Sequence, residues 1–117
     1  MIKPKVNGIY FAKNRDLGIS RYGGHGVIVT SINKKRKTCQ VKTITSLVRP
    51  DNLSEFKPEM VKKIEDGKIL AIPNKSLHSP HLSGVYQKPI TIPISKLGKS
   101  SCNFRYPKRY DKLIHRK

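Results

Sequence analysis

Two runs of alternating apolar and polar residues, joined by four consecutive cations, are the feature that most constrains this fold. The runs extend from Val27 to Ile32 and from Cys39 to Ile44, and the turn between them contains Lys34, Lys35, Arg36 and Lys37. Alternation of β-branched residues predicts half-buried strands, and a short polar connection predicts that the two strands pair antiparallel. We therefore expect a β-hairpin around which a sheet is built.

Three further apolar runs predict strands in the rest of the chain. They are Ile9 to Ala12, Lys68 to Ile72 and Ile90 to Ile94. Pro93 has no backbone N–H to donate to a ladder, so the last of these strands must lie at a sheet edge or contain a bulge.

Two segments predict helices. The first extends from Pro58, at a first-turn position, to the terminating Gly67, with Met60, Val61 and Ile64 on one stripe. The second is shorter and begins at Pro107. The order of elements predicts a mostly β protein with inserted helices, arranged as a small antiparallel barrel. We expect residues 1–117 to form a single domain, with a basic tail at residues 105–117.

Composition identifies the class of partner. The chain of 117 residues carries 25 Lys and Arg against 7 Asp and Glu, a formal net charge of +18. Such a surface repels itself and is usually tolerated because a polyanion neutralises it, most often nucleic acid. Charge alone does not separate an enzyme that acts on nucleic acid from a protein that only binds it.

Several other functional classes find little support in the sequence. The two cysteines, Cys39 and Cys102, form no CxxC pair, so a zinc site is unsupported. One disulfide between them is arithmetically possible, but we expect two reduced thiols. The HxxH formed by His78 and His81 is interrupted by Ser and Pro, which predicts loop histidines. In Pro50 to Lys57 the acids of an apparent PD…ExK nuclease motif are too close together to meet at one metal. We expect no cofactor, no membrane span, no signal peptide and a cytoplasmic location.

The hairpin brings together side chains that are suited to catalysis. His25 precedes the first strand and Thr45-Ser46 closes the second, each about ten residues from the centre of the turn. Residues equidistant from an antiparallel turn lie about 5 Å apart across the ladder. His25 is therefore expected within one or two residues of register of Thr45 and Ser46. The glycines around His25 let the backbone approach a ligand closely, although the same features also fit an ordinary polar hairpin end.

The stretch "NGIYFAKNRDLGISRYGGHGVIVTSINKK" resembles the opening of the MazF/PemK/Kid RNA-cleaving toxins. The loop Gly18 to Gly26 has the length of the family's arginine-containing loop, and "VKTITS" ends where the family has its Thr. Residues 83–97 are similar to a late strand of the family that carries a short helix at its end. The Thr-Ser ending is also similar to the ToxN-like toxins, which share the barrel. The resemblance implies a small SH3-like or PemK-like barrel and metal-independent cleavage of single-stranded RNA by attack of a 2′-hydroxyl.

The resemblance also implies site residues, with departures. The family's phosphate-binding Arg falls on His25, and its Thr falls on Thr45, beside Ser46. Three alternatives remain open: His25 has taken over the role, Arg21 supplies the cation, or the site is inactive. Histidine titrates near neutrality and can transfer protons, while Thr, Ser and Arg can stabilise the charge that develops on phosphate. The predicted catalytic residues are His25, Thr45, Ser46 and Arg21.

Two basic clusters are predicted to bind RNA. One is the hairpin turn together with a cation on the second strand. The other is the tail, in which aromatic residues alternate with six Lys and Arg, as in proteins that hold single strands. The predicted RNA-binding residues are Lys34, Lys35, Arg36, Lys37, Lys42, Arg105, Tyr106, Lys108 and Arg109.

Together these observations predict an endoribonuclease toxin of a toxin–antitoxin system. Its partners would be an RNA substrate and an antitoxin, either an acidic protein or an RNA, and the resemblance implies a homodimer. The alternative is a non-catalytic RNA- or DNA-binding barrel of ribosomal or phage-regulatory type.

Overall fold

The computed structural model describes residues 3–49, 51–74, 81–100 and 104–115. The chain divides into two compact units: Met1–Thr43 with Pro89–Cys102, and Ile44–Lys88 with Asn103–Lys117. We refer to them as unit 1 and unit 2 and describe each by itself. That residues 1–117 form one domain stays a prediction.

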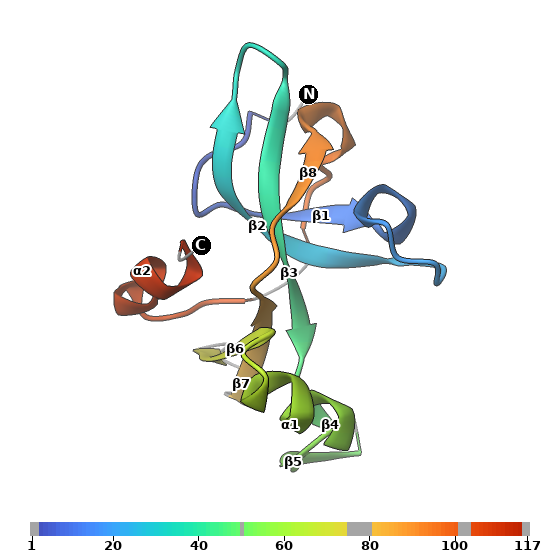
Figure 1. Cartoon of the computed structure of the whole chain (residues 1–117), viewed down its shortest axis with the longest axis vertical. Coiled ribbons are helices and arrows are strands. Elements are labelled where there is room, and N and C mark those ends of the chain that lie inside the picture. The colour runs from blue at the N-terminus through green and yellow to red at the C-terminus, as the bar shows by residue number, and fades with distance from the viewer. Residues whose placement is uncertain (1–2, 50, 75–80, 101–103, 116–117) are drawn as a thin grey trace. The chain divides into compact units, whose positions relative to one another are not determined.

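Unit 1 is built on four antiparallel strands (Figure 1). They are β1 (Ile9–Lys13), β2 (Gly24–Asn33), the first part of β3 (Thr38–Ser46) and β8 (Ile90–Pro93), in the order β1-β2-β3-β8. One face of this sheet packs into a core that consists of Ala12, Leu17, Val27, Val29, Cys39, Val41, Ile92 and Leu97. The two alternating runs therefore supply half of this core, and removal of its apolar surface from water is the main favourable term in folding.

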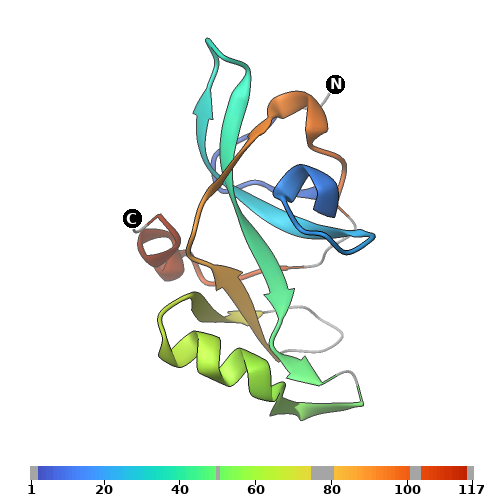
Figure 2. The same cartoon turned by 45° about the vertical axis from the view of Figure 1, so that its right-hand side comes forward.

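The β2–β3 hairpin is confirmed. Its two strands are joined by the turn at residues 34–37, which forms one end of the long hairpin in Figure 2. Lys37 adopts a positive φ of 55°, which allows the chain to reverse there. A bulge shifts the register between Val29 and Ser31, and from there the ladder continues to Val27↔Thr43.

The other predicted strands of unit 1 are also present. β8 ends at Pro93, pairs only with β3 among the described strands, and leads into a 3-10 helix, η2 (Ile94–Lys96). The backbone of Gly98 then exchanges two hydrogen bonds with that of Phe11 on β1. This isolated bridge brings the chain back to β1, but β8 itself does not pair with β1. The protein is mostly antiparallel β, and its sheet is not closed into a barrel.

Unit 2 contains the end of β3, which pairs with β7 (His81–Tyr86), and β7 in turn pairs with β6 (Ile69–Asn74). A small hairpin, β4 (Val48–Arg49) with β5 (Asn52–Phe56), leads into the predicted helix α1 (Pro58–Glu65), which contacts β6. The shorter predicted helix consists of a 3-10 turn, η3 (Lys108–Tyr110), and α2 (Asp111–Ile114). Both predicted helices are therefore confirmed.

Some parts of unit 2 differ from the expectations. His81 begins strand β7, so the prediction of a loop is wrong there, while His78 lies outside the described residues. The carboxylates of Asp51 and Glu55 accept hydrogen bonds from Arg49 at 2.9 and 3.2 Å, so both acids of the apparent nuclease motif pair with one guanidinium.

The structure also bears on the cysteines and on membrane-spanning helices. Cys39 is a buried free thiol whose pKa is raised by its burial, and Cys102 lies outside the described residues. Within the described ranges, no helix is both long enough and apolar enough to cross a bilayer.

Candidate functional site

His25 lies on β2, directly opposite Ala12 of β1, and its side chain is half-buried. Its Nδ1 lies 2.6 Å from Oδ1 of Asn14, the first residue of the 3-10 helix η1 (Asn14–Leu17) that follows β1. Asn14 is 4% exposed, so this contact is shielded from water. The pair therefore fixes the imidazole ring from one side.

The second hydrogen bond of Asn14 decides how the ring is protonated. Its Nδ2 donates to the carbonyl oxygen of Tyr22 at 3.4 Å, which leaves Oδ1 as the atom that faces His25. Because an amide oxygen only accepts, Nδ1 of His25 must carry the hydrogen. In the neutral ring the lone pair then resides on Nε2, which is the nitrogen free to accept a proton.

The pKa of His25 is lowered from its usual value of 6.5, first by burial and then by the positive charge of Arg21. Burial disfavours the charged imidazolium, and a nearby cation adds repulsion. The ring is therefore neutral at pH 7, with an unprotonated Nε2. Arg21 itself is exposed, so a single cation both influences the ring and faces solvent.

The loop that carries Arg21 is shaped by glycine. Gly18 caps η1 with a φ of 76°, and Gly23 has a φ of 111°, both in the region that favours glycine. A Cβ on Gly24 would lie 2.6 Å from the carbonyl oxygen of Ala12 and closer still to the ring of Phe11. Gly18 and Gly23 thus allow the backbone turns of the loop, and Gly24 allows a close approach within the chain. That the glycines around His25 let a ligand approach stays a prediction.

Backbone hydrogen bonds attach the same loop to Asn14. The N–H of Asn14 donates to Gly23 at 2.8 Å, and the carbonyl of Asn14 accepts from Ile19 at 2.9 Å. Side chain and backbone of Asn14 therefore hold the loop and His25 together. Asn14 could not be identified from the sequence, since no motif marks an Asn that precedes the histidine by eleven positions.

Thr45 and Ser46 lie at the end of β3 in unit 2. They pair with Gly84 and Ser83 of β7, and the Ser46 hydroxyl donates to the Val48 carbonyl at 3.4 Å. Thr45 is half-buried and Ser46 is exposed. The ladder between β2 and β3 ends at Val27↔Thr43, before either residue. That Thr45 and Ser46 lie close to His25 stays a prediction.

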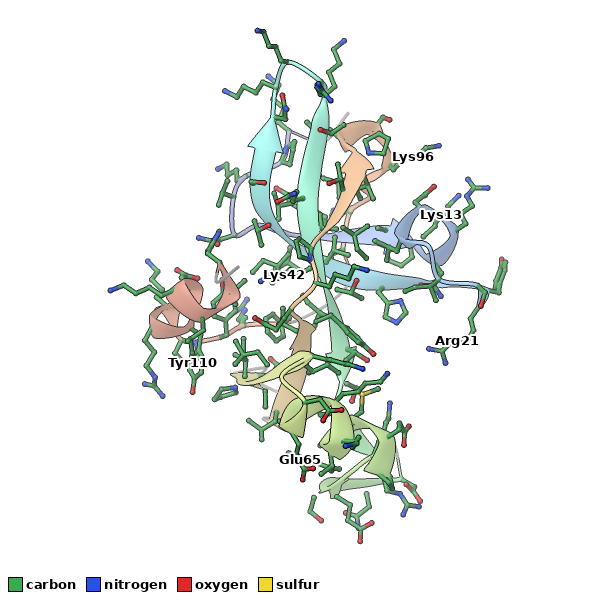
Figure 3. All side chains as sticks on the ribbon, viewed as in Figure 1. Lys13, Arg21, Lys42, Glu65, Lys96 and Tyr110 are labelled. Atoms are coloured by element: carbon green, nitrogen blue, oxygen red, sulfur yellow. The ribbon has the colours of Figure 1, made fainter. Side chains whose placement is uncertain are left out.

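The four cations of the hairpin turn are all exposed, as a phosphate-binding surface requires. Lys34 and Arg36 also line a polar cavity of about 700 Å³ between the turn and β8. Lys42, shown on β3 in Figure 3, is instead 3% exposed, and burial lowers its pKa. Its burial does not favour the predicted contact with RNA.

In the tail, apolar residues pack and cations face solvent. Phe104 and Ile114 are buried, whereas Arg105, Lys108 and Arg109 are exposed. The Tyr106 hydroxyl donates to Asp111 at 2.6 Å, and burial together with this carboxylate raises its pKa well above the usual range. Tyr106 also packs against Phe104, with ring centroids 5.4 Å apart, so its ring is partly occupied within the protein.

Among the described residues, no three His, Cys, Asp or Glu side chains gather in a way that could hold a metal ion. Comparison of the chain with models of protein families, with curated proteins and with solved structures gives no match.

Proposed function

We propose that this protein is an endoribonuclease toxin of a toxin–antitoxin system that cleaves single-stranded RNA without a metal ion. The observation that carries the proposal is the His25–Asn14 pair, which presents a lone pair on Nε2 beside an exposed arginine. The basic character of unit 1 supports it, because twelve Lys and Arg accompany one carboxylate, that of Asp16. A polyanion is the natural partner of such a surface.

In the proposed reaction, Nε2 of His25 accepts the proton of a ribose 2′-hydroxyl as the oxygen attacks the adjacent phosphorus. The bond between O2′ and phosphorus forms as the bond from phosphorus to O5′ breaks, and the leaving O5′ takes up a proton from water. The products are a 2′,3′-cyclic phosphate and a 5′-hydroxyl, and the proton on Nε2 returns to solvent. The guanidinium of Arg21 stabilises the charge that develops on the phosphate oxygens. Thr45 and Ser46 keep the role predicted from the sequence, as hydroxyl donors to the same charge.

The test is cleavage of a single-stranded RNA by the His25→Ala variant. Loss of one general base typically lowers a rate by about 10²–10⁴-fold, whereas RNA binding should stay within a few fold of wild type. Thr45→Ala should lower the rate less, as the loss of one donor. The wild-type reaction should survive EDTA and leave 5′-hydroxyl ends.

His115→Ala is the matched control, because His115 is also half-buried but is not among the proposed catalytic residues. It should cleave at the wild-type rate. A requirement for metal, or full activity in a His25→Ala, Thr45→Ala double variant, would contradict the assignment.

The second candidate is a non-catalytic RNA- or DNA-binding protein. The observation that favours it is the position of Asn14, whose hydrogen bonds would serve equally to hold the loop in place. A wild type that binds RNA tightly and leaves it intact would decide for this candidate.

The finer architecture and the partners belong to the same proposal. The backbone bridge between Phe11 and Gly98 supports a PemK-like barrel, since it joins the segment after β8 to β1. A homodimer and an antitoxin, acidic protein or RNA, follow from the proposed class of toxin. An acidic antitoxin would complement the cations of unit 1.

A further inference from the structure

A second feature of unit 1, distinct from the His25–Asn14 pair, is a cavity of about 300 Å³ at the β1–β2 loop. It is lined by Phe11, Lys13, Arg15, Arg21, Tyr22 and Gly23. Figure 3 shows Lys13 and Arg21 at the same end of the β1–β2 pair. The volume is at the lower end of the range for ligand pockets, about 300–1,000 Å³. We call it the loop cavity.

The loop cavity is strongly cationic. Within the described residues, neither Lys13 nor Arg21 has a carboxylate partner, and Arg15 reaches only Asp16, at 3.9 Å. The Arg15 side chain is 71% exposed against 16% for Asp16, so much of this cation remains accessible to a ligand in solvent. Three cations on one small concave surface are suited to an anion with several oxygens, such as a phosphodiester.

Aromatic rings accompany these cations. Tyr22 is fully exposed, with no side chain covering its ring, and Phe11 is half-buried beside it in the cavity wall. An uncovered aromatic ring next to cations is how proteins hold unpaired nucleotides, because the ring stacks on the base while the cations bind the backbone.

The strand register separates the loop cavity from His25. His25 pairs with Ala12, which belongs to the core face of β1, whereas Phe11 and Lys13 alternate to the other face. Arg21 is the residue common to both, since it lines the cavity and its charge acts on His25. The cavity is thus a neighbour of the proposed catalytic histidine and does not overlap it.

We infer that the loop cavity binds one unpaired nucleotide of a single-stranded RNA, with its base stacked on Tyr22 and its phosphate held by Lys13 and Arg15. The inference rests on the proposed function for the identity of the substrate and names a subsite that flanks the reacting phosphate. Recognition of the substrate would therefore require a nucleotide whose base is unpaired.

The experiment measures binding of a single-stranded 2′-O-methyl RNA, which has no free 2′-hydroxyl and so cannot be cleaved by the proposed route. Tyr22→Ala should weaken binding about 10-fold, and Tyr22→Phe, which keeps the ring, should stay close to wild type. A duplex of the same sequence should be insensitive to Tyr22→Ala, because its bases are already stacked.

A pair of double variants separates the cavity from net charge. Lys13→Glu with Arg15→Glu should weaken binding roughly 10-fold or more, whereas Lys68→Glu with Lys88→Glu, the same change of charge at exposed sites of unit 2, should weaken it far less. Equal losses in the two double variants, or a Tyr22→Ala variant that binds like wild type, would overturn the inference. A wild type that does not cleave RNA but shows these losses would remove the proposed activity and leave the loop cavity as an RNA site.

Discussion

At the scale of single residues, Asn14 determines which nitrogen of His25 carries the hydrogen. Its amide donates to Tyr22, so its oxygen can only accept from Nδ1 of the ring. Burial and Arg21 then hold the pKa of His25 below 6.5, which keeps the ring neutral in the physiological range. A base that is neutral and oriented before substrate arrives needs no rearrangement at the moment of reaction.

This arrangement has a measurable pH dependence. The base form of His25 is lost as the pH falls through its lowered pKa, so the acid limb of the kcat/KM profile should have its midpoint below 6.5. Asn14→Asp places a carboxylate at the 2.6 Å contact and favours the imidazolium, which raises the pKa of His25 above that in the wild type. The variant should therefore be slower than wild type at pH 6 and similar at pH 8.

The unfolding free energy should also increase with pH, as the activity does. Below 6.5 the unfolded chain binds a proton at His25 more readily than the folded protein does, so the unfolding free energy of wild type rises as the pH rises to about 6.5. Asn14→Asp should reduce this rise. Circular dichroism should show that both the wild type and the Asn14→Asp variant are folded. If the acid limbs of their kcat/KM profiles were then identical, His25 would not be the titrating base.

Two residues of the candidate site could be identified from their residue type alone. His25 and Arg21 could be found because few side chains exchange protons or bind phosphate, and both lie in a loop rich in glycine. Asn14 and Tyr22 could not, because their importance arises from burial in one case and full exposure in the other. Both properties depend on how the loop folds back on β1.

At the scale of elements, the approach of β2 to β1 depends on Gly24. A Cβ there would collide with the Ala12 carbonyl oxygen and the Phe11 ring, so the strands would have to separate. We expect Gly24→Ala to lower the unfolding free energy by about 1–3 kcal/mol, as overpacking does elsewhere. Chemical denaturation of purified protein measures this directly.

Gly98→Ala is the matched control. Its Cβ would lie 3.6 Å from the Phe11 carbonyl oxygen, an ordinary contact, and its φ is not positive. The unfolding free energy should change by less than about 1 kcal/mol. Equal destabilisation by the two substitutions would show that the close approach at Gly24 is not what limits this site.

Elements with strong periodicity could be predicted, and those with weak signals could not. The β2–β3 hairpin and α1 have clear apolar patterns and recognisable ends. β7 could not be predicted because its buried positions include a polar residue, Ser83, and Gly84, a residue type that is depleted in strands. Gly84 is required there because a Cβ would lie 2.7 Å from Leu47 and Ile69, a constraint that appears only once the strands are packed.

At the scale of the whole molecule, charge is unevenly distributed along the chain. Five of the seven carboxylates fall between Asp51 and Asp66, where Arg49 and Lys62 pair with some of them. Unit 1 and the tail retain most of the net charge. Binding of RNA should therefore depend on these two regions and should be driven by release of counterions.

The corresponding prediction is a steep dependence of RNA affinity on salt. Log K should fall with log salt with a slope of about −0.7 for each phosphate contacted on a single strand. Deleting the tail would remove Ile114, which is fully buried, so substitution is the cleaner change. Lys108→Gln, Arg109→Gln and Lys112→Gln together should reduce the slope by up to about 2 if all three contact phosphate. A slope near zero in wild type would contradict nucleic-acid binding.

The class of fold could be predicted, and its closure could not. A mostly antiparallel β protein with short helices follows from strand periodicity and turn residues, and it is confirmed. Closure into a barrel depends on how β1 meets the chain after β8, which here is the single bridge at Gly98. Such long-range pairing leaves no periodic trace in the sequence.

Among the described strands, β6 and β8 each pair with a neighbour on one side only. Each of them contains a proline near its end. β6 contains Pro73 after the apolar run Ile69–Ile72, and β8 contains Pro93 after the β-branched run Ile90–Ile92. Runs of this kind are the segments from which β proteins aggregate edge to edge, because an open edge offers its backbone to another chain. Proline withholds one N–H and resists extension of the ladder. The chain thus combines apolar edge strands with built-in protection against growth into fibrils, and its high net charge adds electrostatic repulsion between copies.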